Sequence, residues 1–259
     1  MTLALLAFVA FLGFTVEATA GFGSMVVALT LAAWFLPIDR VLVSLLPVNV
    51  LLSAYLTLRH RQHIDGRVLA RHVFAWMVPG MLLGMAPAAL EHVWPALAGG
   101  ARAGDLIRGV FAAFVVVLAA VELWRARAGT ATDTRALPAP VAASALVGAG
   151  VIHGLFACGG PLLVYVVGRE LTDKARFRAT LSAVWLLLNA ALLVPRVVVG
   201  DLDRDALTGS GVMVASLVGG LALGEWLHHR LPVARFRIAV FALLLVAGLA
   251  LLVRSLRGT

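Results

Sequence analysis

The chain alternates between long apolar runs and short polar gaps. Six runs contain no Asp, Glu, Lys or Arg, namely 41–58, 73–90, 109–121, 179–195, 206–224 and 238–253. A bilayer core about 30 Å thick is crossed by roughly 17–25 helical residues. Most of these runs therefore predict one transmembrane helix each.

Two further apolar runs are too long for one span and are interrupted by glycines. Residues 1–38 carry a single charge, Glu17, and residues 136–168 carry none. At ~1.5 Å per residue, a straight helix over the second run would be about 50 Å long. The interruptions are Gly21-Phe22-Gly23-Ser24 and Cys158-Gly159-Gly160-Pro161. Because Gly and Pro disfavour helix, each run predicts two half-helices that meet at a kinked tip.

The two halves of the chain share these features at a nearly constant offset. The break at Ala20–Ser24 matches that at Ala157–Pro161, Asn49 matches Asn189, Ile64-Asp65 matches Leu202-Asp203, and Gly80/Gly84 match Gly220/Gly224. The offset drifts by only three residues, which small loop insertions would produce. We therefore predict a duplication, with repeats at 1–124 and 140–259 joined by a linker at 125–139.

Basic residues gather in alternate gaps, and this predicts the topology. Gap 59–72 contains four Arg against one Asp, which is typical of a cytoplasmic loop. The same rule places the linker 125–139, residues 169–178 and residues 228–237 inside, with 91–108, 200–205 and both termini outside. Each half then has one broken, re-entrant hairpin and three transmembrane helices, about 8–10 membrane segments in all. Because each half crosses an odd number of times, the repeats are expected to be inverted.

Composition agrees with an all-α polytopic membrane protein. Hydrophobic residues make up 62% of the chain, charged residues 13%, and the mean hydropathy is +1.00. Soluble domains are about 45–50% apolar and about 25% charged. The net charge of +8 is explained by the basic gaps, so we expect the lipid bilayer and not nucleic acid as the partner. The single cysteine excludes a disulfide framework, and no cofactor or nucleotide-binding motif is expected.

The paired breaks are where chemistry is expected. Inverted repeats with broken helices are typical of secondary transporters. An irregular backbone is tolerated at membrane depth only where protein buries it or where it lines a wet cavity. The start of a second half-helix offers unpaired N–H groups and the positive end of the helix dipole. Two such starts near the bilayer midplane would bind a small anion without a buried Lys or Arg.

The glycine-rich break after the first helix, the second copy at Gly159-Gly160-Pro161 and the basic gap after the second segment resemble the sulfite exporter TauE/SafE family. The resemblance covers essentially the whole chain. It implies a permease for sulfur-containing anions in the bacterial inner membrane. The family usually has a richer glycine run at each break, whereas here the first copy is Gly21-Phe22-Gly23 and the second carries Cys158.

Glu17 and His153 occupy nearly equivalent places, each just before a break. An ionisable group at membrane depth costs about 2.5–3.5 kcal/mol on insertion scales and is a functional candidate. Glu17 could couple a proton, or it could be a protonated carboxyl bonded to a neighbouring helix. His153 could serve in a proton relay or could be a neutral packing histidine.

Asn49 and Asn189 are repeat-related amides within spans, and each could donate twice to an oxyanion. They could equally hold the bundle together by interhelical hydrogen bonds. Thr19 and Ser24 flank the first tip and could donate hydroxyls. The complete set of substrate-binding candidates is Thr19, Gly21, Phe22, Gly23, Ser24, Asn49, Cys158, Gly159, Gly160, Pro161 and Asn189.

Cys158 near His153 also suggests a nucleophile and its base. No third orienting group accompanies them, and a small buried cysteine is the commoner case. The leading hypothesis is a secondary permease for a small sulfur-containing anion such as sulfite or an organosulfonate, working by alternating access. The alternatives are a permease for another small anion, such as a carboxylate, and an intramembrane enzyme.

Overall fold

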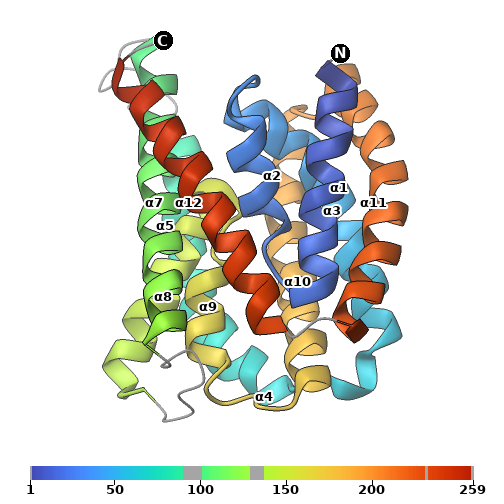
Figure 1. Cartoon of the computed structure of the whole chain (residues 1–259), viewed down its shortest axis with the longest axis vertical. Helices are drawn as coiled ribbons and strands as arrows, with labels where there is room; N and C mark the ends of the chain where they lie inside the picture. The colour runs from blue at the N-terminus through green and yellow to red at the C-terminus, as the bar shows by residue number, and fades with distance from the viewer. Residues whose placement is uncertain (1, 90–100, 129–136, 231–232, 258–259) are drawn as a thin grey trace.

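The computed structural model describes residues 2–89, 101–128, 137–230 and 233–257, and the regular elements in these ranges are all helical (Figure 1). Eight helices in the described residues are long and apolar enough to cross a membrane. The expectation of an all-α polytopic membrane protein is therefore confirmed. Parts of the predicted loops 91–108 and 228–237, and residues 129–136 of the predicted linker 125–139, lie outside the described residues.

The first half begins with a hairpin and continues with long helices. The helices are α1 (Thr2–Ala20), α2 (Ser24–Ala32), α3 (Ile38–Arg59), α4 (Gly66–Val68), α5 (Val78–Ala89) and α7 (Ala101–Arg127). A short 3₁₀ turn η1 (Arg61–His63) follows α3, and a π-helix η2 (Leu69–Met77) joins α4 to α5 into one span.

The second half follows the same order. Figure 1 shows α1 and α8 starting at opposite ends of the molecule, whereas the N- and C-termini lie at the same end. The helices are α8 (Ala139–Phe156), α9 (Gly160–Val167), α10 (Lys174–Val199), α11 (Arg204–Arg230) and α12 (Val233–Arg257). Each half therefore contains one hairpin followed by longer helices.

Both predicted breaks are present and both produce a hairpin with one short leg. Helix α1 ends at Ala20 and α2 begins at Ser24, while α8 ends at Phe156 and α9 begins at Gly160. Helix α2 has 9 residues and α9 has 8. At ~1.5 Å per residue each is only about 12–14 Å long, less than half of a bilayer core of about 30 Å. The short legs are therefore re-entrant, and their N-terminal ends lie inside the bundle.

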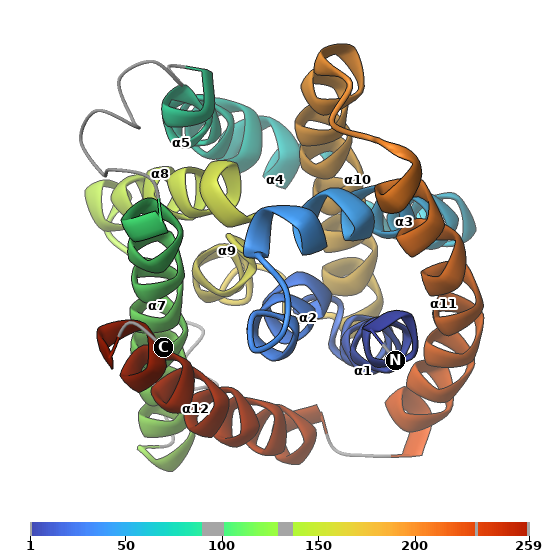
Figure 2. The same cartoon turned by 90° about the horizontal axis from the view of Figure 1, so that it is seen from above.

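Contacts between the two halves follow a two-fold pattern. Helix α1 packs on α11 and α5 packs on α8, while α3 packs on α10 and α12 packs on α7. If α1, α3, α5 and α7 are exchanged with α8, α10, α11 and α12, respectively, the contact of α1 with α11 becomes that of α8 with α5. The contacts of α3 with α10 and of α7 with α12 stay the same. Figure 2 shows α2 and α9 in the middle of the bundle, with the long helices around them. The duplication itself stays a prediction.

The repeat-related glycine pairs bring helices from different halves into close contact, as small-xxx-small faces do. A Cβ atom at Gly80 or Gly84 would lie 2.2 Å from the carbonyl oxygen of Val147 or Val151 in α8. On α11, a Cβ at Gly220 would lie 2.9 Å from the Phe11 carbonyl, and one at Gly224 would lie 2.7 Å from the Thr15 carbonyl. These distances are too short for any side chain, so the glycines let the helix backbones touch.

Two aspartates begin helices and also bind an arginine of the other half. Asp65 accepts the backbone N–H of Arg67 at 2.9 Å and the Arg176 guanidinium at 2.6 Å. Burial alone would raise the pKa of Asp65, but these contacts and the N–H of Val68 lower it below its ordinary value.

Asp203 has the matching arrangement in the loop before α11. Its carboxylate accepts the N–H of Ala206 at 2.8 Å and the Arg40 guanidinium at 2.9 Å. The N–H of Ala206 is the main cause that lowers the pKa of Asp203, and Arg40 adds to it. Both ion pairs are partly exposed, so they contribute little to stability and mainly fix the loops between spans.

The glycine contacts generate a prediction on α5. We expect Gly84→Ala to lower the free energy of unfolding by roughly 1–3 kcal/mol, because its methyl group would collide with the α8 backbone. Gly211→Ala on α11 is the control, since no described atom lies within 4 Å of the added methyl. There, alanine should be neutral or stabilise by up to about 1 kcal/mol. Thermal unfolding in detergent measures both, and equal effects would contradict the close-contact interpretation.

Candidate functional site

The two helix breaks are built in the same way. The N–H of Gly21 donates to the carbonyl of Glu17 at 2.7 Å, and the N–H of Ala157 donates to the carbonyl of His153 at the same distance. Both residues after the long legs have left-handed backbone, with φ of 84° at Gly21 and 54° at Ala157. Glu17 and His153 therefore occupy equivalent positions, one turn before each break.

The tips of both hairpins line one cavity with an empty volume of about 280 Å³. Its lining comes from α1, the two breaks, α2, α9, α3 and α10. The residues are Glu17, Gly23, Ser24, Met25, Val26, Asn49, Ala157, Cys158, Gly160, Pro161, Trp185 and Asn189.

A chain of hydrogen bonds crosses this cavity wall from one half to the other. The Asn189 amide donates to the Asn49 carbonyl oxygen at 2.7 Å. The Asn49 amide in turn donates to the Ser24 hydroxyl at 2.5 Å and lies 3.3 Å from the Glu17 carboxyl. The Ser24 hydroxyl donates to the same carboxyl oxygen, Oε2. Asn49 and Asn189 therefore form a hydrogen bond between helices and also line the cavity.

Several buried polar atoms at this wall have no partner among the described residues. They are Oε1 of Glu17, Oδ1 of Asn189 and both ring nitrogens of His153. Asn189 lies beside the His153 ring, but the contact lacks the geometry of a hydrogen bond. Unpaired buried polar groups are uncommon and cost about 1–3 kcal/mol each. The oxygens of Glu17 and Asn189, which line the cavity, are therefore candidates for contact with a bound solute or with water.

The helix starts at the cavity are also open. Gly23 precedes α2 and Gly159 precedes α9, and neither glycine has a side chain that could cap its helix. The backbone N–H of Ser24 faces the carboxyl of Glu17. At α9 the first residue is Gly160, and Pro161 has no N–H to donate. The two starts therefore differ, because a carboxyl is already present at the first.

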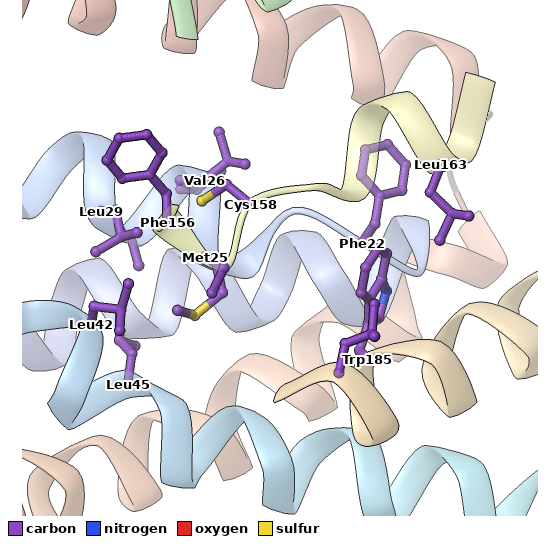
Figure 3. Packing of buried hydrophobic residues seen from close by; sticks show 14 of the residues in the cluster. Phe22, Met25, Val26, Leu29, Leu42, Leu45, Phe156, Cys158, Leu163 and Trp185 are labelled. Atoms are coloured by element: carbon purple, nitrogen blue, oxygen red, sulfur yellow. The ribbon is translucent and has the colours of Figure 1, made fainter. Parts of the chain in front are cut away.

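Trp185 is the principal site residue that the sequence did not suggest. Its indole N–H donates to the Gly21 carbonyl at 2.9 Å, so α10 of the second half holds the tip of the first. The His153 ring stacks on the indole with 5.9 Å between ring centroids. Figure 3 shows the Trp185 ring near Phe22. A sequence signal existed, since Trp185 lies one helical turn before Asn189 and therefore on the same face.

Some predicted residues lie beside the cavity but do not line it. The Thr19 hydroxyl bonds the carbonyls of Thr15 and Gly224, so it faces α11. The Gly21 carbonyl accepts from Trp185, and Phe22 lines a neighbouring apolar cavity. Gly159 packs against α8, and the His153 ring stacks on Trp185. The structure brings together Glu17, Gly23, Ser24, Asn49, Cys158, Gly160, Pro161 and Asn189.

Cys158 is buried and lines the cavity, close to Val26 in Figure 3. In the described part of the chain neither nitrogen of His153 bonds the thiol, so the two do not form a bonded nucleophile and base. Groups of three His, Cys, Asp or Glu side chains that could hold a metal ion are likewise absent from the described residues. The arrangement offers donors and acceptors around a small cavity.

Comparison with known proteins adds the evolutionary context. The model of the family described as "Sulfite exporter TauE/SafE" matches residues 5–251. A protein of Comamonas testosteroni, described as a probable inner membrane transporter protein TsaS, is 30% identical over 181 residues, which covers 68% of this chain and 72% of that protein. No solved structure matches the chain significantly.

The hydrogen-bonded wall generates a second prediction. We expect Asn49→Leu to lower the free energy of unfolding by about 1–3 kcal/mol for each partner left unpaired, because the Asn189 amide would lose its acceptor and Ser24 its donor. Ser53→Ala, one turn later on α3, is the control. The Ser53 hydroxyl is fully buried and without a partner in the described residues, so its removal should be neutral or stabilising. Chemical or thermal unfolding would show the difference, and a larger effect of Ser53→Ala would contradict the network.

Proposed function

The chain belongs to the sulfite exporter TauE/SafE family and is a multi-pass inner-membrane transporter, and we propose that it carries a small sulfur-containing anion such as sulfite or an organosulfonate. Family and relative both point to transport and not to catalysis. The observation that carries the proposal is the cavity at which the starts of α2 and α9 meet, because the only carboxyl among the described lining residues, that of Glu17, lies at the first start and leaves the second without one. Each start adds the positive end of a helix dipole, equivalent to roughly half a charge.

The anion is expected to bind mainly at the second tip. At the first tip Glu17 already faces the donors of Ser24 and Asn49. At the second tip no carboxyl is present among the described lining residues, and the start of α9 lies beside the Asn189 amide. An oxyanion there could accept from backbone N–H groups and from a rotated Asn189 amide, which donates twice.

Glu17 gives the site a means of coupling the anion to a proton. A carboxylate and an anionic solute in one small, poorly hydrated cavity would repel each other strongly. Binding of the anion therefore favours protonation of Glu17, and release of the proton favours loss of the anion. His153 can serve as the second proton site, because its ring nitrogens are unpaired in the described residues and its ring contacts Trp185.

Alternating access is proposed to work through the pseudo-two-fold arrangement of the halves. The Asn189–Asn49 hydrogen bond and the Trp185–Gly21 hydrogen bond join the halves at the cavity. A rocking of one half against the other would open the cavity first to one face and then to the other. We place both termini outside and the linker 125–139 in the cytoplasm, as the basic gaps predict.

Transport in proteoliposomes tests the proposed site. Radiolabelled sulfite should enter vesicles containing the protein, and Gly160→Val should abolish uptake while leaving insertion intact. The added side chain would meet the Trp185 ring, which lies 3.5 Å from a Cβ at that position. Gly23→Val should have the same effect, because Gly23 has φ of 107°, which branched side chains cannot adopt without strain.

Gly211→Val is the matched control, since that position is exposed and open. Normal uptake by Gly160→Val or Gly23→Val would exclude the tips as the site. Competition by unlabelled acetate or another carboxylate, equal to that by sulfite, would favour the alternative of a general small-anion permease. The enzyme alternative would be favoured by two results together: the unaltered protein transports nothing, and Cys158→Ala abolishes formation of a product that the unaltered protein makes.

A separate prediction concerns the proton. Glu17→Gln keeps an acceptor for Ser24 and Asn49 but has no proton to release. We expect it to retain exchange of labelled for unlabelled anion and to lose accumulation driven by a pH gradient, by at least tenfold. Ser53→Ala should retain both activities. Accumulation by Glu17→Gln at the ordinary rate would show that Glu17 does not couple the proton.

A further inference from the structure

Arg178 is the most deeply buried arginine or lysine among the described residues, with 9% of its surface exposed. It lies near the start of α10, at the end of the bundle that the basic gaps assign to the cytoplasm. Its backbone packs on the first tip, because a Cβ atom at Gly21 would lie 3.6 Å from the Cα atom of Arg178. The sequence assigned this residue to a cytoplasmic gap, whereas the structure places it directly against the first break.

The Arg178 guanidinium joins two helices without using all of its donors. Its Nη2 atom donates to Oε1 of Glu225 on α11 at 3.1 Å. Its Nε–H is buried and has no acceptor among the described residues. The Arg178 side chain is 11% exposed and the Glu225 side chain 25%, so the carboxylate has access to water that the guanidinium lacks. A buried donor without an acceptor is uncommon and favours contact with an additional acceptor.

The surroundings of this ion pair are mainly basic. His60, at the end of α3, has a buried Nε2 atom without a partner in the described residues. Burial is the main cause that lowers the pKa of His60, and the nearby charge of Arg178 lowers it further. Arg59 and His63 act in the same direction, and Glu225 opposes them. An anion that approaches from the cytoplasm therefore meets a cluster of nitrogen donors in which Glu225 is the competing acceptor.

One face of α10 leads from the ion pair to the polar cavity. Arg178, Ser182, Trp185 and Asn189 follow one another at spacings of three or four residues, which places them on one face of the helix. All four are buried, and Trp185 and Asn189 line the cavity. At ~1.5 Å per residue, Arg178 lies about 10 Å from Trp185 along the helix axis.

We propose that Arg178 receives the transported anion on the cytoplasmic side by exchanging its partner, so that the anion replaces the carboxylate of Glu225. The ligand class is a small oxyanion, because such an anion offers a guanidinium the same acceptor oxygens as a carboxylate does. Room for it comes from the carboxylate itself, which turns toward water. The exchange also releases α11 from α10 beside the first tip. This inference rests on the proposed function, because the same anion is taken to continue to the cavity.

Two substitutions that break the same ion pair distinguish this role from that of a structural clamp. Arg178→Gln removes the receiving cation and leaves the charge of Glu225, whereas Glu225→Gln removes the competing carboxylate and leaves the guanidinium. In everted membrane vesicles, whose cytoplasmic face is outward, initial rates of radiolabelled sulfite uptake give KM and kcat. We expect Arg178→Gln to raise KM by about tenfold or more and Glu225→Gln to lower it roughly threefold. A clamp would move KM in the same direction in both variants.

Arg176→Gln is the matched control, since Arg176 also begins α10 and pairs with a carboxylate, that of Asp65, but is exposed. Its KM should stay within about twofold of the unaltered protein, because an exposed pair contributes little. If Arg178→Gln does not fold, Glu225→Gln decides alone, and an unchanged or raised KM would overturn the receiving role. KM shifts of the same sign in both variants would overturn it too and leave the proposed function standing. Absence of sulfite uptake by the unaltered protein would overturn the proposed function and this inference with it.

Discussion

Unpaired backbone groups cannot face lipid, and this constraint organises the whole molecule. Each hairpin interrupts its helical hydrogen bonds at membrane depth, at 21–23 and 157–159. Hydrocarbon offers no partner for the N–H groups that such a break leaves open. The breaks are therefore in the middle of the bundle, surrounded by long helices whose outer faces are apolar (Figure 2). The glycine contacts of α5 with α8 and of α11 with α1 let the surrounding helices close tightly around them.

The same arrangement makes the site nearly symmetric in its backbone and asymmetric in its chemistry. The long legs end with equivalent hydrogen bonds, and Asn49 pairs with its repeat counterpart Asn189. Glu17, however, is matched by His153, an acid by a base. In the proposed mechanism, the symmetric frame would give two equivalent routes of access, and the unequal pair would let one tip bind the anion while the other exchanges a proton.

Much of this organisation could be predicted from the sequence because it depends on local chemistry. Glycines within an apolar run indicate a break. The offset between Asn49 and Asn189 is nearly the same as the offset between the two breaks, and this indicates equivalent places in two halves. The sequence could not show which way a side chain points once the helices pack. Thr19 and Gly159 were expected at the cavity, yet Thr19 bonds α11 and Gly159 packs on α8. Trp185 was missed because its importance comes from a contact with Gly21, 164 residues away along the chain.

The contact between Trp185 and Gly21 also bears on how the protein is made. Chains emerge from the ribosome N-terminal end first, at about 5–20 residues per second. The first hairpin is therefore in the membrane well before α10 exists, and its tip lacks the indole N–H that later binds it. During that interval the broken helix needs water, another protein or a temporary helical conformation to satisfy its backbone. A chain that stops before α10 would therefore lack this donor and leave the Gly21 carbonyl without its indole partner.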